Sequence, residues 1–208
     1  MNPLIDQITS KVRRLMLSVA KLLNTFSGGR ISPDAITWTG LVMHIVIAWL
    51  IAGGRHGMAA VLLVIFGLFD ALDGALARLQ NKSGNAGMLL DATTDRMKEV
   101  LLYTGAAYYF IRDARLLNFA VWAVAACGTS LCVSYVKAKG ETAVKDTKLS
   151  PSEVNRLFGD GFARFQVRML LLVVGLAINR VEFAIVLITL LAILTTVSRL
   201  AAITKRLR

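Results

Sequence analysis

Residues 57–78, GMAAVLLVIFGLFDALDGALAR, decide the fold. They carry no charge from 57 to 69 and then reach Asp70, Asp73 and Arg78. An uncharged apolar run predicts a helix inside a membrane, where carboxylates are costly unless a cation or water compensates them. The stretch therefore predicts a spanning helix that ends in a polar site.

The composition of the whole chain supports a membrane protein. Of its 208 residues, 56% are apolar and only 18% are charged, which lies outside the range of ordinary soluble domains. The balance of 24 Lys and Arg against 13 Asp and Glu gives a net charge of +11. In a membrane protein this excess predicts basic cytosolic loops and an anionic lipid or substrate, and no nucleic acid partner.

Six apolar segments predict an all-α integral membrane protein with six transmembrane helices, at residues 35–52, 57–69, 86–111, 116–136, 165–179 and 183–198. The third segment is polar in its first turns and apolar from Val100 onwards. We expect residues 1–208 to form a single domain, of which 33–208 are the six-helix bundle.

The N-terminal residues predict an amphipathic helix. Apolar residues follow helical spacing at Leu4, Ile8, Val12, Leu15, Val19 and Leu22. Charged residues lie between them at Asp6, Lys11, Arg13, Arg14 and Lys21. We interpret residues 1–32 as an interfacial helix and its loop, with the basic side on lipid headgroups, and not as a signal peptide. The alternative is a surface helix packed on its own domain.

The distribution of basic residues predicts the orientation of the chain. One side of the membrane receives Lys11, Arg13, Arg14, Lys21, Arg30, Arg78, Lys82, Lys137, Lys139, Lys145, Lys148, Arg156, Arg164, Arg168, Lys205, Arg206 and Arg208. The other side receives Arg55, Arg112, Arg115 and Arg180. Because cytosolic loops are enriched in Lys and Arg, we expect both termini and the active site to face the cytosol, in the cytoplasmic membrane.

Four carboxylates lie around the connection between the second and third predicted spans. Asp70 and Asp73 are three residues apart, and Asp91 and Asp95 are four apart, so each pair shares one helix face. A short connection makes the two helices an antiparallel hairpin, on which all four can converge near the cytosolic surface. Oxygen ligands suit Mg²⁺ or Mn²⁺, and a paired-metal site would suit a diphosphate substrate.

These residues resemble the signature of the CDP-alcohol phosphotransferase family, also called the CDP-alcohol phosphatidyltransferases. The pattern D-x-x-D-G-x-x-A-R begins at Asp70, and after eight residues G-x-x-x-D-x-x-x-D ends at Asp95. Six spans and an amphipathic N-terminal helix also resemble this family. The resemblance implies displacement of CMP from a CDP-linked donor by an alcohol hydroxyl, with two metal ions, Mg²⁺ or Mn²⁺, held by the aspartates.

The resemblance also implies roles for individual residues. Asp70, Asp73 and Asp91 would ligate the metals, and Asp95 would complete the site and act as general base. Donor binding would involve Pro33, Thr37, Gly74, Ala77, Arg78 and Gly87. For Arg78 the alternative is a cytosolic anchor at a helix end. Pro33 after Ser32 is equally typical of an ordinary helix start.

A second basic group offers a site for a phosphate on the acceptor. Residues 134–138, SYVKA, and Arg199 resemble the acceptor-phosphate residues of phosphatidylinositol-phosphate synthases. The predicted set is Ser134, Lys137, Arg164, Arg168 and Arg199. Arg164 and Arg168 depart from the family pattern, because they are four apart with no proline between them. The alternative for the whole group is anchoring on the cytosolic side.

The predicted reaction joins CDP-diacylglycerol to a phosphorylated alcohol, with inositol phosphate as the first acceptor. The alternative acceptor is glycerol 3-phosphate, which would make the protein a phosphatidylglycerophosphate synthase. Two other classes are a membrane prenyltransferase, which would need two separated Asp-rich motifs, and an ion-coupled transporter, whose acids would lie at the midplane. Membrane lipid is an expected partner, and a homodimer is left open.

The remaining polar residues carry less information. Cys127 and Cys132 lie in an apolar stretch without the partners that a zinc site would need, and we expect neither zinc nor a disulfide. His44 and His56 are isolated in the sequence, so we interpret both as structural.

Overall fold

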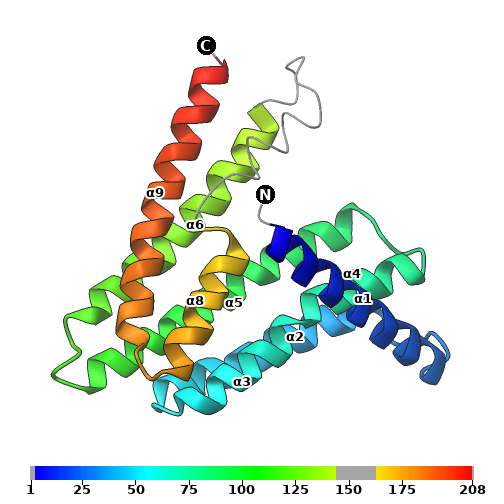
Figure 1. Cartoon of the computed structure of the whole chain (residues 1–208), viewed down its shortest axis with the longest axis horizontal. Coiled ribbons are helices and arrows are strands. Elements are labelled where there is room, and N and C mark those ends of the chain that lie inside the picture. The colour runs from blue at the N-terminus through cyan, green and yellow to red at the C-terminus, as the bar shows by residue number, and fades with distance from the viewer. Residues whose placement is uncertain (1–2, 144–162, 208) are drawn as a thin grey trace. The chain divides into compact units, whose positions relative to one another are not determined.

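The computed structural model describes residues 3–143 and 163–207, and this part of the chain is helical (Figure 1). The helices are α1 (Pro3–Phe26), α2 (Pro33–Ala52), α3 (His56–Gly67), α4 (Phe69–Leu79), α5 (Asn85–Arg112), α6 (Phe119–Ala143), α8 (Phe165–Ala177) and α9 (Val181–Leu207). The basic residues Lys145, Lys148, Arg156 and Arg208 lie outside the described residues.

The predicted spanning segments are mostly helical: 57–69 covers α3 and the first residue of α4, with Leu68 between them, and 116–136 begins three residues before α6. Four helical stretches in the described residues are long and apolar enough to cross a membrane, namely Pro33–Ala52, His56–Leu79, Phe119–Ala143 and Val181–Arg206. These stretches agree with an integral membrane protein. Helix α8 has only 13 residues, and α5 is charged in its first half, so the count of six spans stays a prediction.

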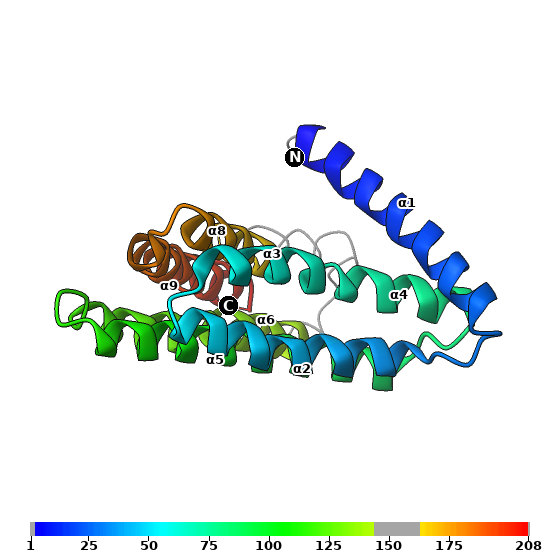
Figure 2. The same ribbon diagram turned by 90° about the horizontal axis from the view of Figure 1, so that it is seen from below.

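The chain forms two compact units, and each is described by itself. The first comprises Met1–Ile47 and Val61–Leu101, and the second comprises Ala48–Ala60 and Leu102–Arg208. In the first unit, α1 runs obliquely to α4 and packs against it (Figure 2). The buried core of this contact consists of Met16, Ala20, Ile36, Leu72, Ala75 and Leu76.

Helix α1 has two apolar edges. The inner edge, with Met16 and Ala20, is buried against α4. The outer edge leaves Leu15, Leu22 and Phe26 exposed, and 84% of Phe26 is accessible. The helix therefore packs on its own unit, as the alternative interpretation expected, while its outer edge stays uncovered. Its location at a membrane interface remains a prediction.

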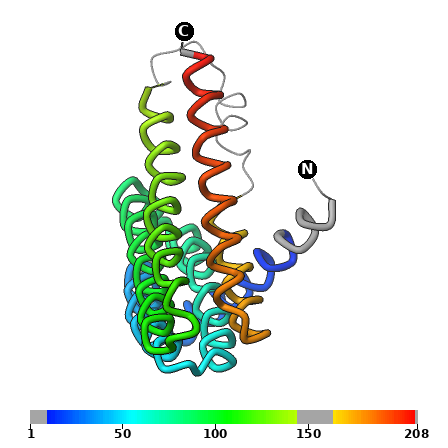
Figure 3. The backbone as a smooth tube through the Cα atoms, turned by 90° about the vertical axis from the view of Figure 1, so that its left-hand side faces the viewer, coloured from blue at the N-terminus to red at the C-terminus, as the bar shows by residue number. Residues whose placement is uncertain are grey.

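In the second unit, α6 and α9 lie side by side and α8 packs on α9 (Figures 1 and 3). Polar contacts join the helices: Tyr103 Oη on α5 lies 3.2 Å from Ser130 Oγ on α6. Thr189 on α9 lies 3.3 Å from the carbonyl oxygen of Trp122 on α6. Hydroxyl-bearing side chains suit these positions because they bond across packed helices and leave no buried hydroxyl unpaired.

Both histidines are buried and hydrogen-bonded within their own units. His44 Nδ1 lies 2.7 Å from the carbonyl oxygen of Gly40, one helical turn earlier. His56 Nδ1 lies 2.5 Å from Asn179 Oδ1, and its ring packs edge-on against Tyr109. These contacts fit the structural interpretation of both residues. Cys127 and Cys132 are free thiols in this structure.

A close approach of backbones in the second unit generates a testable prediction. A Cβ atom at Gly105 on α5 would lie 2.5 Å from the carbonyl oxygen of Ala48 on α2, too close for any side chain. We expect Gly105→Ala to destabilise the protein by about 1–3 kcal/mol, because the backbones must separate. Thermal unfolding in detergent measures this as a Tm lower by about 2–4 °C per kcal/mol.

The matched control is Gly128→Ala on α6, where an added Cβ would meet no neighbouring atom within 4 Å. Alanine favours the helix by about 0.8–1 kcal/mol over glycine, so this change should leave the Tm unchanged or raise it. Equal Tm values for the two variants would contradict the close approach.

Candidate active site

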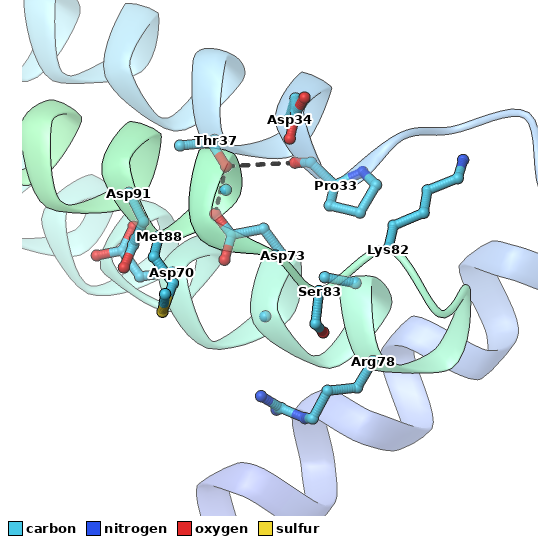
Figure 4. Close-up of a pocket in the computed structure, with 14 residues that line it drawn as sticks. Pro33, Asp34, Thr37, Asp70, Asp73, Arg78, Lys82, Ser83, Met88 and Asp91 are labelled. Atoms are coloured by element: carbon cyan, nitrogen blue, oxygen red, sulfur yellow. Dashed lines mark hydrogen bonds between the residues drawn. The ribbon is translucent and has the colours of Figure 1, made fainter.

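A pocket of about 550 Å³ opens in the first unit between the start of α2, helix α4 and the start of α5 (Figure 4). Its lining consists of Pro33, Asp34, Thr37, Asp70, Asp73, Gly74, Ala77, Arg78, Lys82, Ser83, Gly84, Gly87, Met88 and Asp91. All six predicted donor residues are in this set, together with three of the four aspartates. The hairpin of α4 and α5 thus brings together residues that the motif separates in sequence.

Three of the predicted metal ligands lie close together. Asp70 on α4 and Asp91 and Asp95 on α5 each offer one carboxylate oxygen, and these oxygens lie within 4.8 Å of one another. A set of carboxylate oxygens at this spacing fits a hard divalent cation such as Mg²⁺ or Mn²⁺. The type and spacing of these oxygen atoms therefore fit the divalent metal that the motif implies.

Asp73 is outside this group of three, although it faces the same pocket. Its Oδ2 accepts a hydrogen bond from Thr37 Oγ1 at 2.6 Å. Thr37 Oγ1 also lies 3.3 Å from the carbonyl oxygen of Pro33 (Figure 4). Thr37, which sequence reasoning assigned to the nucleotide, therefore orients a carboxylate of the motif.

The start of α2 explains how Thr37 reaches this position. Ser32 Oγ accepts a hydrogen bond at 3.1 Å from the backbone N–H of Ala35, which is the N-cap arrangement expected before Pro33. This cap fixes the first turn of α2, so the hydroxyl of Thr37 one turn later points at Asp73. The residues that start α2 therefore also place Thr37 beside Asp73.

The pocket side of the motif glycines is open. A Cβ at Gly87 would meet no neighbouring atom within 4 Å, and one at Gly74 would meet only Arg78 Nη1, at 3.5 Å. Packing inside the protein therefore does not require glycine at these two positions. The open space beside Gly74 and Gly87 agrees with their predicted role, which is to leave room for a bound nucleotide. The side chain of Arg78 is exposed at the edge of the same pocket.

Sequence reasoning missed Lys98. Its Nζ lies 2.5 Å from Asp70 Oδ1 and 3.4 Å from Asp95 Oδ1, and only 1% of its side chain is exposed. The available signal was helical spacing, because Lys98 follows Asp91 by seven residues and Asp95 by three, on one face of the helix.

The predicted acceptor residues lie in the second unit and differ in burial. Arg168 is 1% exposed and donates to the carbonyl oxygen of Ala163. Arg199 is 6% exposed, and its Nη1 lies 3.4 Å from the carbonyl oxygen of Val133. Arg164 is exposed. The positive charges of Arg164 and Arg168 both lie close enough to act on that of Arg199.

The other two predicted acceptor residues bond along their own helix. Lys137 is half exposed, and its Nζ lies 3.8 Å from Glu141 Oε1, one turn later on α6. Ser134 donates to the carbonyl oxygen of Ser130 at 3.3 Å. Arg199 thus interacts electrostatically with Arg164 and Arg168, whereas Lys137 and Ser134 have partners on α6.

Comparison with known families identifies the class of protein. The model of the CDP-alcohol phosphatidyltransferase family matches residues 30–198, which include the whole aspartate motif. The chain therefore belongs to the CDP-alcohol phosphatidyltransferase family, as the motif predicted.

Two curated relatives are synthases of inositol phosphate lipids. The chain is 29% identical to the phosphatidylinositol phosphate synthase of Cutibacterium acnes over 135 residues, which cover 62% of this chain and 65% of that protein. The match therefore spans slightly less than two thirds of that relative. The archaetidylinositol phosphate synthase of Pyrococcus horikoshii is 25% identical over 204 residues, covering 98% of both chains.

Solved structures share the fold. The Mycobacterium tuberculosis phosphatidylinositol phosphate synthase with CDP-DAG bound aligns with a TM-score of 0.77 at 24% identity, over 91% of this chain and 94% of that one. The same enzyme in complex with manganese and citrate gives a TM-score of 0.75 at 24% identity, over 90% and 88%. Helical architecture is thus common to the three structures.

The hydrogen bond between Thr37 and Asp73 generates a second prediction. Thr37→Val keeps the shape of the side chain but removes the donor, so the carboxylate loses its fixed orientation. Partners of this kind affect metal affinity by about 10–100-fold, and we expect the Kd for Mn²⁺ to rise by about tenfold. Thr37→Ser, which keeps the hydroxyl, should stay near wild type. Electron paramagnetic resonance of free Mn²⁺ measures both, and equal Kd values for Val and Ser would contradict the role.

Proposed function

We propose that this protein transfers the phosphatidyl group of CDP-diacylglycerol to inositol phosphate and releases CMP. The observation that carries the proposal is the convergence of Asp70, Asp91 and Asp95 beside a pocket lined by the family motif. The family membership and the names of the relatives support the same reaction.

The proposed site holds two divalent ions, Mg²⁺ or Mn²⁺, through Asp70, Asp73, Asp91 and Asp95. When bound, such ions neutralise charge on a donor diphosphate and on its leaving group. Arg78 at the pocket edge would add a charge-assisted contact to the diphosphate. Open space at Gly74 and Gly87 would admit the nucleotide close to the backbone of the hairpin.

The chemical step needs a proton acceptor. Asp95 would take the proton of the acceptor hydroxyl as its oxygen attacks the phosphorus that carries the diacylglycerol. The new bond joins this oxygen to phosphorus, the bond from phosphorus to the CMP oxygen breaks, and CMP leaves. A carboxylate suffices as base, because it need only remove the proton during the attack.

Inositol phosphate is the favoured acceptor. Arg164 and Arg168 each repel Arg199, and a phosphate dianion would offset that repulsion through charge-assisted hydrogen bonds. We assign the acceptor phosphate to Arg164, Arg168 and Arg199, with Ser134 and Lys137 from the predicted set beside them. Glycerol 3-phosphate is the second candidate, and the relatives, which are named for inositol lipids, favour it less.

The proposed setting is the cytoplasmic membrane. Six spans would form one catalytic domain with the pocket facing the cytosol, where the basic residues accumulate. The exposed outer edge of α1, with Leu15, Leu22 and Phe26, would enter the interface while Lys and Arg side chains contact anionic headgroups.

The function is tested by CMP release from labelled CDP-diacylglycerol in detergent, with inositol phosphate and glycerol 3-phosphate offered separately. We expect turnover with inositol phosphate that requires Mg²⁺ or Mn²⁺ and is abolished by EDTA, because carboxylates alone would repel the diphosphate. Full turnover in excess EDTA would exclude the metal role. If CMP is released with glycerol 3-phosphate but not with inositol phosphate, inositol phosphate is excluded as the acceptor.

The matched inactive variant is Asp95→Asn, which keeps the size of the side chain but loses the proton acceptor. Turnover should fall by about two to four orders of magnitude. Donor binding should largely survive, which separates loss of the base from loss of the folded site.

The arginine group generates a separate prediction about the acceptor. Loss of one charge-assisted contact costs about 1.5–3 kcal/mol, so Arg199→Gln should raise the KM for inositol phosphate roughly tenfold to a hundredfold. The KM for CDP-diacylglycerol should stay nearly unchanged. Lys205→Gln, which removes an exposed cation from the same helix, is the control. An unchanged acceptor KM in folded Arg199→Gln would return the arginines to an anchoring role.

A further inference from the structure

A buried lysine lies among the acidic residues of the site. Lys98 on α5 reaches Asp70 on α4 at 2.5 Å and Asp95, one turn earlier on α5, at 3.4 Å. Gly40 on α2 covers it closely, because a Cβ there would lie 3.9 Å from both Cε and Nζ of Lys98. The ammonium is therefore held between three helices of the first unit.

The charges around Lys98 alternate in sign. Asp95 Oδ1 faces Lys98, while its Oδ2 lies 3.7 Å from Arg96 Nη2. Arg96 Nε lies in turn 3.2 Å from Glu99 Oε2, and the Glu99 side chain is 1% exposed. Both oxygens of Asp95 thus have a cationic partner, and the carboxylate is fixed from two sides.

This arrangement offsets the repulsion that the acidic cluster creates. Three carboxylates whose oxygens lie within 4.8 Å of one another repel each other. A buried ammonium is costly on its own, and two carboxylate contacts compensate that cost. Lys98 and the aspartates therefore stabilise one another, in a way that neither the motif nor membrane topology requires.

We propose that Lys98 is a positioning residue that holds Asp70 and Asp95 in the geometry of the metal site and, by its charge, lowers the affinity of that site for divalent cations. The inference rests on the proposed function, because it assigns Asp70 and Asp95 to the metals. It makes Lys98 an internal counter-ion that keeps the carboxylates assembled while metal exchanges.

The test compares wild type, Lys98→Met and Lys21→Met in detergent without substrate. Lys21→Met removes an exposed lysine from α1 and serves as the matched control. Removing one positive charge at ion-pair distance should tighten Mn²⁺ binding by about tenfold or more. Electron paramagnetic resonance of free Mn²⁺ gives this Kd directly, and Lys21→Met should match wild type.

Thermal unfolding supplies a second readout. In EDTA, Lys98→Met should unfold at a lower temperature than wild type, because its carboxylates repel without compensation. Saturating Mn²⁺ should then raise its Tm by more than it raises that of wild type. A lysine needed for packing alone would lower the Tm equally with and without Mn²⁺, and would not tighten Mn²⁺ binding.

Turnover separates the inference from the proposed function. At saturating Mn²⁺, we expect Lys98→Met to lose about tenfold in kcat, because Asp95 is no longer fixed, with the KM for CDP-diacylglycerol nearly unchanged. A wild-type protein that neither binds Mn²⁺ nor releases CMP would contradict the proposed function itself. If the wild-type protein is active but Lys98→Met binds Mn²⁺ no more tightly than wild type, the role of Lys98 is overturned and the proposed function stands.

Lys98→Gln keeps a hydrogen-bond donor without the charge and replaces Lys98→Met if that variant does not fold. Folding of either variant only in the presence of Mn²⁺ would support the counter-ion role. Failure of both to fold with or without Mn²⁺ would assign Lys98 to packing and overturn the inference.

Discussion

The structure depends on one electrostatic constraint: carboxylates at the end of an apolar helix must be compensated. Asp70 follows an uncharged run on the continuous stretch His56–Leu79, and the α4–α5 hairpin brings Asp91 and Asp95 to it. Thr37 and Lys98 complete the compensation from α2 and α5. The Ser32 cap, the α4–α5 hairpin and the buried Lys98 therefore together offset the free-energy cost of placing these carboxylates at the end of an apolar helix.

The two units divide the chemistry between them. The first holds the acidic pocket, lined by aspartates and by glycines whose pocket side is open. The second holds buried arginines on α8 and α9, whose partners include backbone carbonyl oxygens. The carboxylates and the buried arginines thus belong to different units of the chain.

Local patterns predicted the helices and most of the candidate site. The spacing of the motif fixes which faces Asp70, Asp91 and Asp95 occupy, so their convergence follows from a short hairpin. The helix ends were less predictable: α6 continues to Ala143 and α9 to Leu207, because charged residues extend a helix beyond its apolar segment. Lys98 was missed because hydropathy treats a lysine as a polar interruption, whereas its role depends on a partner 28 residues earlier.

Helix α1 shares its buried core with α4, and α4 carries Asp70 and Asp73. Any displacement of α1 must therefore either move α4 with it or expose Met16 and Ala20. The outer edge of α1, with Leu22 and Phe26 uncovered, is one of the exposed apolar surfaces of the first unit. The position of α4, and with it that of Asp70 and Asp73, therefore depends on the packing of α1.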